Sequence, residues 1–279
     1  MSDPVLVGVD GSEASLAAVD VAVREARLRG CGLRIVHAFI WPLMHVSLGP
    51  AKHGPAEGGL RQQAEEVLAV ARDRARALDP RLEVYTELVT GEPLSVLARR
   101  SRESCLAVVG SRGLGRFGAL LIGSVAVHLA AHAACPVLIV RGRPDPGGDV
   151  LVAVDGSGVG AEAGGFAFAE AAVRGARLTA LHVWHPHAGF PDQEERVLAE
   201  ALAGWREKYP EVELRSSVLE AHPRPALIEA SREAQLLVVG ARGRGGFAGM
   251  LLGSTSQAMI QHAHCPVAVV RHEDAAAAD

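Results

Sequence analysis

Two glycine-rich segments of identical spacing have the residue types best suited to hold a ligand in this sequence. Each follows an apolar run and precedes an expected helix, so the pattern reads strand, glycine-rich loop, helix start. Glycines let the backbone approach phosphate oxygens closely and adopt positive φ, and free N–H groups at a helix start attract anions. A serine at the cap would add a hydroxyl donor. The two segments share the pattern G-x2-G-x9-G-S and consist of Gly110, Gly113, Gly123 and Ser124, and of Gly240, Gly243, Gly253 and Ser254.

The same segments also fit a simpler structural role, because Ser and Gly cap helices after tight turns in many proteins. One copy would leave the two interpretations balanced, whereas two copies of the same spacing favour a phosphate site. Arg112 and Arg242 lie inside the G-x2-G turns, where a guanidinium could clamp phosphate oxygens or simply point into solvent. Asp10 and Asp155 each end a first strand, where they could bind a nucleotide, hold Mg²⁺ or cap the following helix.

Other motifs exclude several classes of enzyme. Residues 113–118 match GxGxxG, but they follow the fourth strand and no Asp or Glu occurs from 119 to 144, so an NAD-binding fingerprint is excluded. The sequence has no GxxxxGK[ST], no HExxH and no kinase motif set. Four cysteines without a CxxC predict neither a zinc site nor a disulfide framework. The repeated pairs His37/His182 and Cys135/Cys265 are expected to be packing residues, with a reactive thiol as the alternative for the cysteines.

The chain consists of two related halves. VLVGVDGS at 5–12 recurs as VLVAVDGS at 150–157, and CPVLIVR at 135–141 recurs as CPVAVVR at 265–271. The offset is 145 positions at Asp10 but 130 at Gly110, so the second copy lacks 15 residues between these points. The Pro/Gly/His-rich stretch 42–60 is the expected insertion, and the Pro/Gly cluster 142–149 is the expected linker. The sequence therefore predicts two domains, residues 1–142 and 149–273.

Short apolar runs alternate with longer amphipathic segments within each copy. In the first copy we expect strands near 4–10, 33–39, 82–89, 105–110 and 136–141, and helices near 13–29, 57–78, 93–103 and 122–132. Near-continuous Val, Ile and Leu predict strands buried on both faces, as in a parallel sheet. The alternation predicts an α/β fold with two tandem doubly wound, Rossmann-like domains.

Composition and charge limit the classes of partner. The chain is 49% hydrophobic, and its net charge of -4 argues against a generic nucleic-acid-binding role. Cysteine usage and the lack of a secretory signal favour a cytoplasmic location. Residues 119–140 have no Lys, Arg, Asp or Glu and are long enough to span a membrane. Because Gly123-Ser124, two histidines and Pro136 interrupt this run, we expect a buried helix and strand and no membrane partner.

Both halves resemble the universal stress protein family over nearly the whole chain. The resemblance rests on VDGS after the first strand, VVG-x2-G-x9-GS after the fourth, and CPV-x-[IV]-V-R at the end of each half. It implies a five-stranded parallel sheet of order 3-2-1-4-5 in each domain, with the two fifth strands paired antiparallel inside the tandem chain. The intact glycine loop is that of the family's ATP-binding branch, so the resemblance also implies ATP with Mg²⁺ as the ligand.

The resemblance assigns roles residue by residue. Asp10 and Asp155 would lie at the nucleotide, and main-chain groups near Ala38 and Val183 would hold adenine. Ribose would contact the glycine that ends each fourth strand, Gly110 or Gly240. The phosphates would be lined by Gly113, Gly123, Ser124 and Val125 in the first half, and by Gly243, Gly253, Ser254 and Thr255 in the second.

The chain departs from the family pattern at a few positions. Family members often have Asp at the start of the fourth strand, where this chain has Cys105 and Gln235. The second half has Ala221 in place of Gly91 and lacks the insertion, so we expect the two halves to bind nucleotide with unequal affinity.

Three functional hypotheses follow. The first is a regulatory stress-response protein that binds ATP in both halves and signals occupancy to a protein partner, since no catalytic base is evident. The second is a slow ATPase or phosphotransferase, in which the aspartates and loop arginines position Mg²⁺ and stabilise charge. The third is a protein-interaction module whose loops only cap helices. Exposed edge strands also leave open a homodimer.

Overall fold

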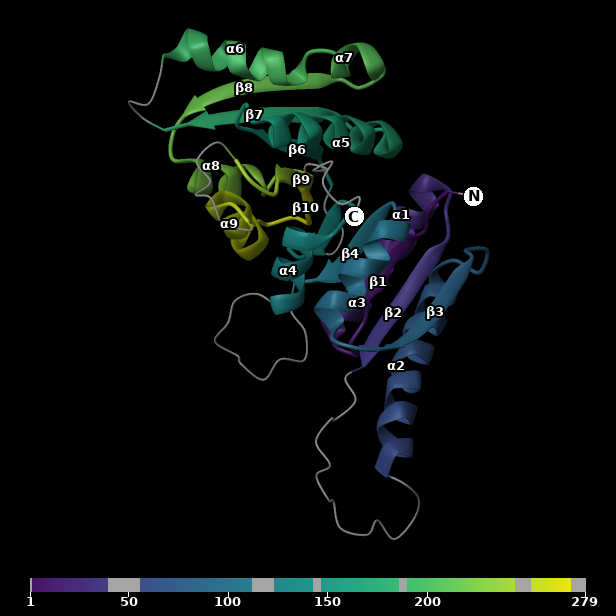
Figure 1. Cartoon of the computed structure of the whole chain (residues 1–279). Coiled ribbons are helices and arrows are strands. Elements are labelled where there is room, and N and C mark those ends of the chain that lie inside the picture. The colour runs from purple at the N-terminus through teal and green to yellow at the C-terminus, as the bar shows by residue number, and fades with distance from the viewer. Residues whose placement is uncertain are drawn as a thin grey trace, which may run out of the picture.

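The computed structural model describes residues 2–39, 56–111, 123–142, 147–185, 190–243 and 252–271 (Figure 1). Strands and helices alternate through the described part of the first half. The strands are β1 (Val5–Gly8), β2 (Leu33–Phe39), β3 (Val84–Thr90), β4 (Leu106–Gly110) and β5 (Val137–Val140). The helices are α1 (Glu13–Arg29), α2 (Ala56–Leu78), α3 (Pro93–Arg100), the 3-10 helix η1 (Ser101–Glu103) and α4 (Ser124–His132).

The second half repeats this order with one change, because α6 and the short α7 stand where the first half has the longer α2. Residues 42–55 of the expected insertion at 42–60 lie outside the described residues, and residues 56–60 belong to the start of α2. The strands are β6 (Asp149–Val154), β7 (Leu178–Trp184), β8 (Leu214–Glu220), β9 (Ala234–Gly240) and β10 (Val267–Val270). The helices are α5 (Gly158–Arg174), α6 (Pro191–Leu202), α7 (Trp205–Lys208), α8 (Pro223–Ala230) and α9 (Ser254–His262).

The described strands form one ten-stranded sheet of order β3-β2-β1-β4-β5-β10-β9-β6-β7-β8. Each half therefore has the order 3-2-1-4-5, and strands within a half run parallel. β5 and β10 pair antiparallel, with Leu138 opposite Ala268, so the two sheets join at the centre. Figure 1 shows the strands following one another from β3 at the lower right to β8 at the top.

Local signals explain where the first helix of each half begins and ends. Ser12 is the N-cap of α1, and its hydroxyl oxygen accepts a hydrogen bond from the Ser15 N–H at 3.2 Å. Ser157 caps α5 in the same way, accepting from the Gly160 N–H at 3.1 Å. α1 ends at Gly30, whose φ of 60° is left-handed backbone that glycine adopts without strain.

α1 and α5 bring four charged side chains together where the two halves meet. Arg29 bonds Glu25 on its own helix and Glu170 on α5, and Arg174 bonds the same two carboxylates from the other side. These side chains, which we call the charge ring, are between 3% and 14% exposed. Burial raises the pKa of Glu170 although both arginines oppose that shift. Burial lowers the pKa of Arg29, but Glu170 and Glu25 more than offset it, so this pKa lies above its ordinary value.

The described part of the apolar stretch 119–140 is a helix followed by a strand. α4 buries Ala126, Leu129 and Ala130 against the sheet, and β5 then forms the central strand pair. The expected helix near 122–132 is first described from residue 123 and begins at Ser124. Among the described helices, none combines the length and the apolar character needed to cross a bilayer.

Candidate functional site

The predicted ligand residues gather at the carboxyl ends of the strands where strand order reverses. β1 lies between β2 and β4, and β6 lies between β7 and β9. In doubly wound folds the crevice at this point is the usual ligand site. Asp10 follows β1 and Gly110 ends the adjacent parallel strand β4. Asp155 and Gly240 occupy the equivalent positions beyond β6 and at the end of β9.

One carboxylate oxygen of each aspartate is bonded within its own turn. Asp10 Oδ1 accepts the Ser12 N–H at 2.9 Å. Asp155 Oδ1 accepts the N–H of Ser157 at 3.0 Å and its hydroxyl at 2.6 Å. The intervening Gly11 has a φ of 85°, which favours glycine. The aspartates therefore fix the turns and the serines cap the helices, so the alternative of an aspartate N-cap is wrong.

Glycines of the predicted loops lie where a side chain would collide with the site. A Cβ on Gly243 would lie 2.2 Å from Asp155 Oδ2, so the second loop touches the aspartate turn although the two are far apart in the sequence. A Cβ on Gly110 would lie 2.6 Å from the Ala14 carbonyl oxygen at the start of α1. At Gly240 the nearest atom, at 3.0 Å, belongs to a side chain of α5. Close packing of the strand end against the first helix therefore accounts for the glycine at 110.

Gly110→Ala is expected to lower the free energy of unfolding by about 1–3 kcal/mol, the usual cost of overpacking. The added methyl group would meet the backbone carbonyl of Ala14 at 2.6 Å, and a backbone group moves little. Gly240→Ala is the matched control and should cost less, because its methyl group would meet looser contacts, the side chain of Val159 at 3.0 Å and the carbonyl oxygen of Arg242 at 3.2 Å. Urea denaturation of both variants measures the difference, and equal costs would contradict this account.

The helices α4 and α9 begin without a side-chain cap. Their N-caps are Gly123 and Gly253, both with a φ of -67°. Because glycine has no side chain, neither N-cap residue offers a side-chain acceptor to the N–H groups of the first turn. The expected serine caps are therefore wrong, because Ser124 and Ser254 are the first helical residues. Gly253 donates its N–H to the Ala241 carbonyl at 2.8 Å, which ties the helix start to the loop after β9. A helix start of this kind presents N–H groups to an anion.

The repeated histidines brace the strand ends that precede the aspartates. His37 Nδ1 lies 2.7 Å from the carbonyl one residue before Asp10, and His182 makes the equivalent contact at 2.7 Å. Because a carbonyl only accepts, each Nδ1 is the donor. His182 Nε2 also lies 2.7 Å from Glu194 Oε2. The first half has Ala64 at the position equivalent to Glu194, 130 residues earlier in the sequence. The prediction of hydrogen-bonded packing histidines is confirmed for this pair.

The remaining predicted residues lie at the ends of the same elements. Ala38 is half-buried and Val183 buried near the carboxyl ends of β2 and β7, and Arg242 is exposed just after β9. Val125 and Thr255 are half-buried in the first turns of α4 and α9, beside the exposed serines that begin these helices. Two predicted site residues lie outside the described residues, namely Arg112 and Gly113.

Sequence and fold both match known proteins. A family model described as the universal stress protein family matches residues 1–141 and again 148–271. This chain belongs to the universal stress protein family. A universal stress protein of Mycobacterium tuberculosis is 38% identical over 285 residues, and one of Mycolicibacterium smegmatis is 38% identical over 288 residues, each alignment covering 96% of both chains. The crystal structure of a universal stress protein from Archaeoglobus fulgidus shares the fold, with a TM-score of 0.75, 23% identity and 98% of both chains covered.

The repeated cysteine of this universal stress protein is a packing residue. Cys135 and Cys265 are buried at the start of the two central strands. Burial, with a smaller effect of Cys105, raises the pKa of Cys135 to about 12. Because the thiolate is the reactive form, a thiol of this pKa is inert near neutral pH. Burial and the raised pKa of Cys135 therefore favour the packing role over the alternative of a reactive thiol.

Two residues of the second half support the site but were missed from the sequence. Glu194 of α6 holds His182, and Ser256 of α9 donates its hydroxyl to the Gly240 carbonyl at 2.6 Å. The first half has Ala64 and Ala126 at the equivalent positions. Comparing the two copies position by position is the signal that could have found them, because both are polar replacements of alanine. The two sites of this universal stress protein are therefore built differently behind the glycine loops.

A hollow of about 250 Å³ adjoins the second aspartate turn of this universal stress protein. It lies between α5 and α6 and is lined in part by Gly156, Ser157 and Glu200. The hollow therefore borders both the Asp155 turn and the first residues of α5.

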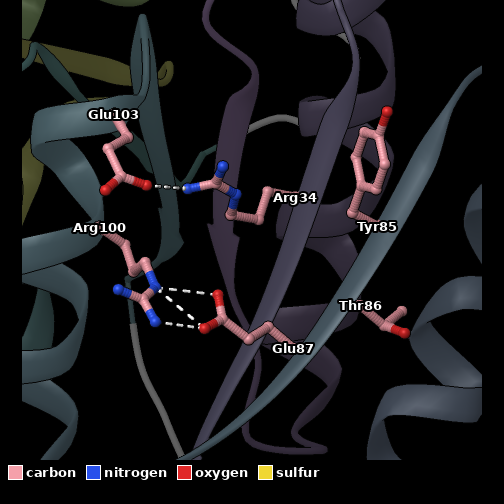
Figure 2. Close-up of a pocket in the computed structure, with 6 residues that line it drawn as sticks. All are labelled: Arg34, Tyr85, Thr86, Glu87, Arg100 and Glu103. Carbon is pink, nitrogen blue, oxygen red and sulfur yellow. Dashed lines mark hydrogen bonds and ion pairs between the residues drawn. The ribbon is translucent and has the colours of Figure 1, made fainter.

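A larger hollow, of about 410 Å³, lies beside the N-terminal parts of β2 and β3 and is separate from the candidate site (Figure 2). In it Arg34 bonds Glu103 at 3.0 Å, and Arg100 bonds both carboxylate oxygens of Glu87. These pairs neutralise the charges that line the hollow. Arg34 lies four residues before Ala38 on β2, which is about 13 Å along the strand, so this hollow is distant from the predicted adenine position.

Proposed function

We propose that this universal stress protein binds ATP with Mg²⁺ in each half and signals occupancy to a protein partner. The phosphates would lie on the first turns of α4 and α9, and adenine beside the ends of β2 and β7. The observation that carries the proposal is that α4 and α9 both begin without a side-chain cap, in halves that each have an aspartate turn and a G-x2-G-x9-G-S segment in the sequence. The same ligand chemistry twice in one chain favours binding over a chance helix cap.

The position of Gly253 supports an approach of the ligand to the backbone. Its φ of -67° suits any residue, and a Cβ there would meet its nearest atom, the Ala241 carbonyl oxygen, at 3.4 Å. Neither conformation nor packing therefore demands glycine. What a side chain would change is access to the N–H groups of the first turn, because N-cap side chains fold over those groups.

Mg²⁺ would be shared between the phosphates and one aspartate of each half. Proteins usually hold Mg²⁺ with one or two carboxylates together with substrate phosphates. Asp155 Oδ2 faces Gly243 of the second loop, and Asp10 is the equivalent carboxylate of the first half. When bound, the ion would neutralise phosphate charge, and the aspartate would hold the ion in position.

Native mass spectrometry of the gently purified chain, with and without Mg-ATP, tests the proposal. We expect mass increments for one and then two ATP molecules, with unequal affinities because the second half alone has Glu194 and Ser256. No increment at millimolar ATP would overturn the proposal and favour an interaction module. Time-resolved ADP release, compared between the wild type and an Asp10→Asn/Asp155→Asn variant, distinguishes a binding protein from a slow ATPase.

A further inference from the structure

Each half of the chain sends one arginine into the other half. Arg141 follows β5, and its Nη1 donates to the carbonyls of Met259 at 2.9 Å and Ile260 at 2.7 Å, both near the end of α9. Arg271 follows β10, and its Nη1 donates to the carbonyl of Ala133 at 3.0 Å, the residue that ends α4. The two arginines are equivalent in the repeat, so the crossing is built into both halves.

The crossing follows from the central strand pair. β5 and β10 run antiparallel, so the end of each strand lies beside the start of the other. The chain reaches each of these strands directly from the end of α4 or α9. The arginine after β5 therefore meets the end of α9, and the arginine after β10 meets the end of α4.

The helices held in this way are the ones that begin at the candidate anion sites. α4 and α9 each have nine residues and are therefore about 13 Å long. Gly123 and Gly253 begin them and the crossed arginines bond their far ends. Each helix thus extends from the glycine loop of its own half to a guanidinium of the other half.

A short helix depends on such contacts for its position. The last carbonyls of a helix run out of backbone partners within the helix, although Met259 still accepts the Ala263 N–H at 3.0 Å, and a cation at this end complements the helix dipole. Isolated helices of this length are marginal in water, so tertiary contacts supply their stability. The backbone next to Arg141 is closely packed, because a Cβ on Gly142 would lie only 2.1 Å from the His264 carbonyl oxygen. The chain after β5 is packed against the loop that follows α9.

We propose that Arg141 is a positioning residue for the nucleotide site of the second half, and Arg271 for that of the first. Each arginine fixes the axial position of a helix whose opposite end binds phosphate. Nucleotide affinity in one half therefore depends on an arginine supplied by the other. The inference rests on the proposed function and adds that the two sites are linked through their helices.

Single-site backgrounds make the crossed effect measurable. Gly253→Asp leaves only the first site and Gly123→Asp leaves only the second, and Mg-ATP affinity is measured in each by titration calorimetry. We expect Arg141→Met to weaken the second site roughly tenfold and to leave the first within about twofold, as measured couplings of this kind suggest. Arg271→Met should do the reverse. Arg141→Lys and Arg271→Lys keep the charge and serve as conservative variants if a methionine variant unfolds, and each should weaken only its crossed site.

Hydrogen exchange separates the failure of this inference from failure of nucleotide binding. Amides of α9 should exchange faster in Arg141→Met, and amides of α4 faster in Arg271→Met, whether or not ATP is present. If the wild type binds no ATP but the exchange pattern is crossed, the proposed function fails, while the positioning of α9 by Arg141 and of α4 by Arg271 stands. If both arginine variants weaken both sites equally, or change neither affinity nor exchange, the positioning role is overturned.

Discussion

Glu170→Gln is expected to lower the free energy of unfolding by about 3–5 kcal/mol, the usual cost of breaking a buried ion pair. The substitution keeps the side-chain volume but removes one of two negative charges from the charge ring. Arg29 and Arg174, 14% and 9% exposed, would then share the single carboxylate of Glu25. One largely buried positive charge would be left without compensation, because two guanidinium groups would face one carboxylate. Guanidinium denaturation followed by circular dichroism measures the change.

An exposed ion pair provides the matched control for the charge ring. Glu229 and Arg232 lie one turn apart on the surface, with side chains 73% and 53% exposed. Glu229→Gln should change stability by less than about 1 kcal/mol, because solvent screens such pairs. Replacing all four members of the charge ring by apolar residues should cost far less than the single change, since no charge is then left unpaired. A loss below 1 kcal/mol for Glu170→Gln would contradict the account.

The repeats and the family resemblance predicted most of the fold. VDGS, the glycine loops and CPV located the strands to within a few residues, and the strand order and the antiparallel central pair agree with the resemblance. The charge ring was not predicted, although Glu25 and Arg29 recur as Glu170 and Arg174 at the 145-residue offset. Spacing of four residues places each pair on one helix face. Only the packing of α1 against α5 turns two surface pairs into a buried network.

The candidate site was predicted in outline but not in its contacts. The sequence predicts Asp155 and Gly243 as ligand residues, yet their contact depends on how the loop after β9 folds over the turn after β6. The serine cap was misassigned by one residue, because Gly and Ser both suit an N-cap and pattern alone does not fix the first helical φ and ψ. The crossed arginines lie in the repeated CPV motif, but their partners belong to the other half.

Gly123→Asp/Gly253→Asp is expected to reduce Mg-ATP affinity at both sites by roughly 100-fold, because two charge-assisted hydrogen bonds to phosphate would be lost. An aspartate N-cap accepts hydrogen bonds from the N–H groups of the first turn. It therefore occupies the donors proposed for phosphate and adds a negative charge beside them. The same cap should leave the free energy of unfolding unchanged or raise it by roughly a few tenths of a kcal/mol at each site, because glycine is itself a tolerated N-cap. Titration calorimetry and urea denaturation measure the two effects on one protein.

The variant is decisive because it should lose affinity without losing stability, whereas a misfolded protein would lose both. Gly253→Ala is the size control: its methyl group would lie 3.4 Å from the Ala241 carbonyl oxygen, an ordinary contact, and it brings neither charge nor cap. We expect this control to bind within a few-fold of the wild type. A doubly substituted protein that stays folded and binds ATP with wild-type affinity would show that the helix starts are not where the phosphates lie. Stable folding with lost affinity would instead assign the phosphates to the first turns of α4 and α9.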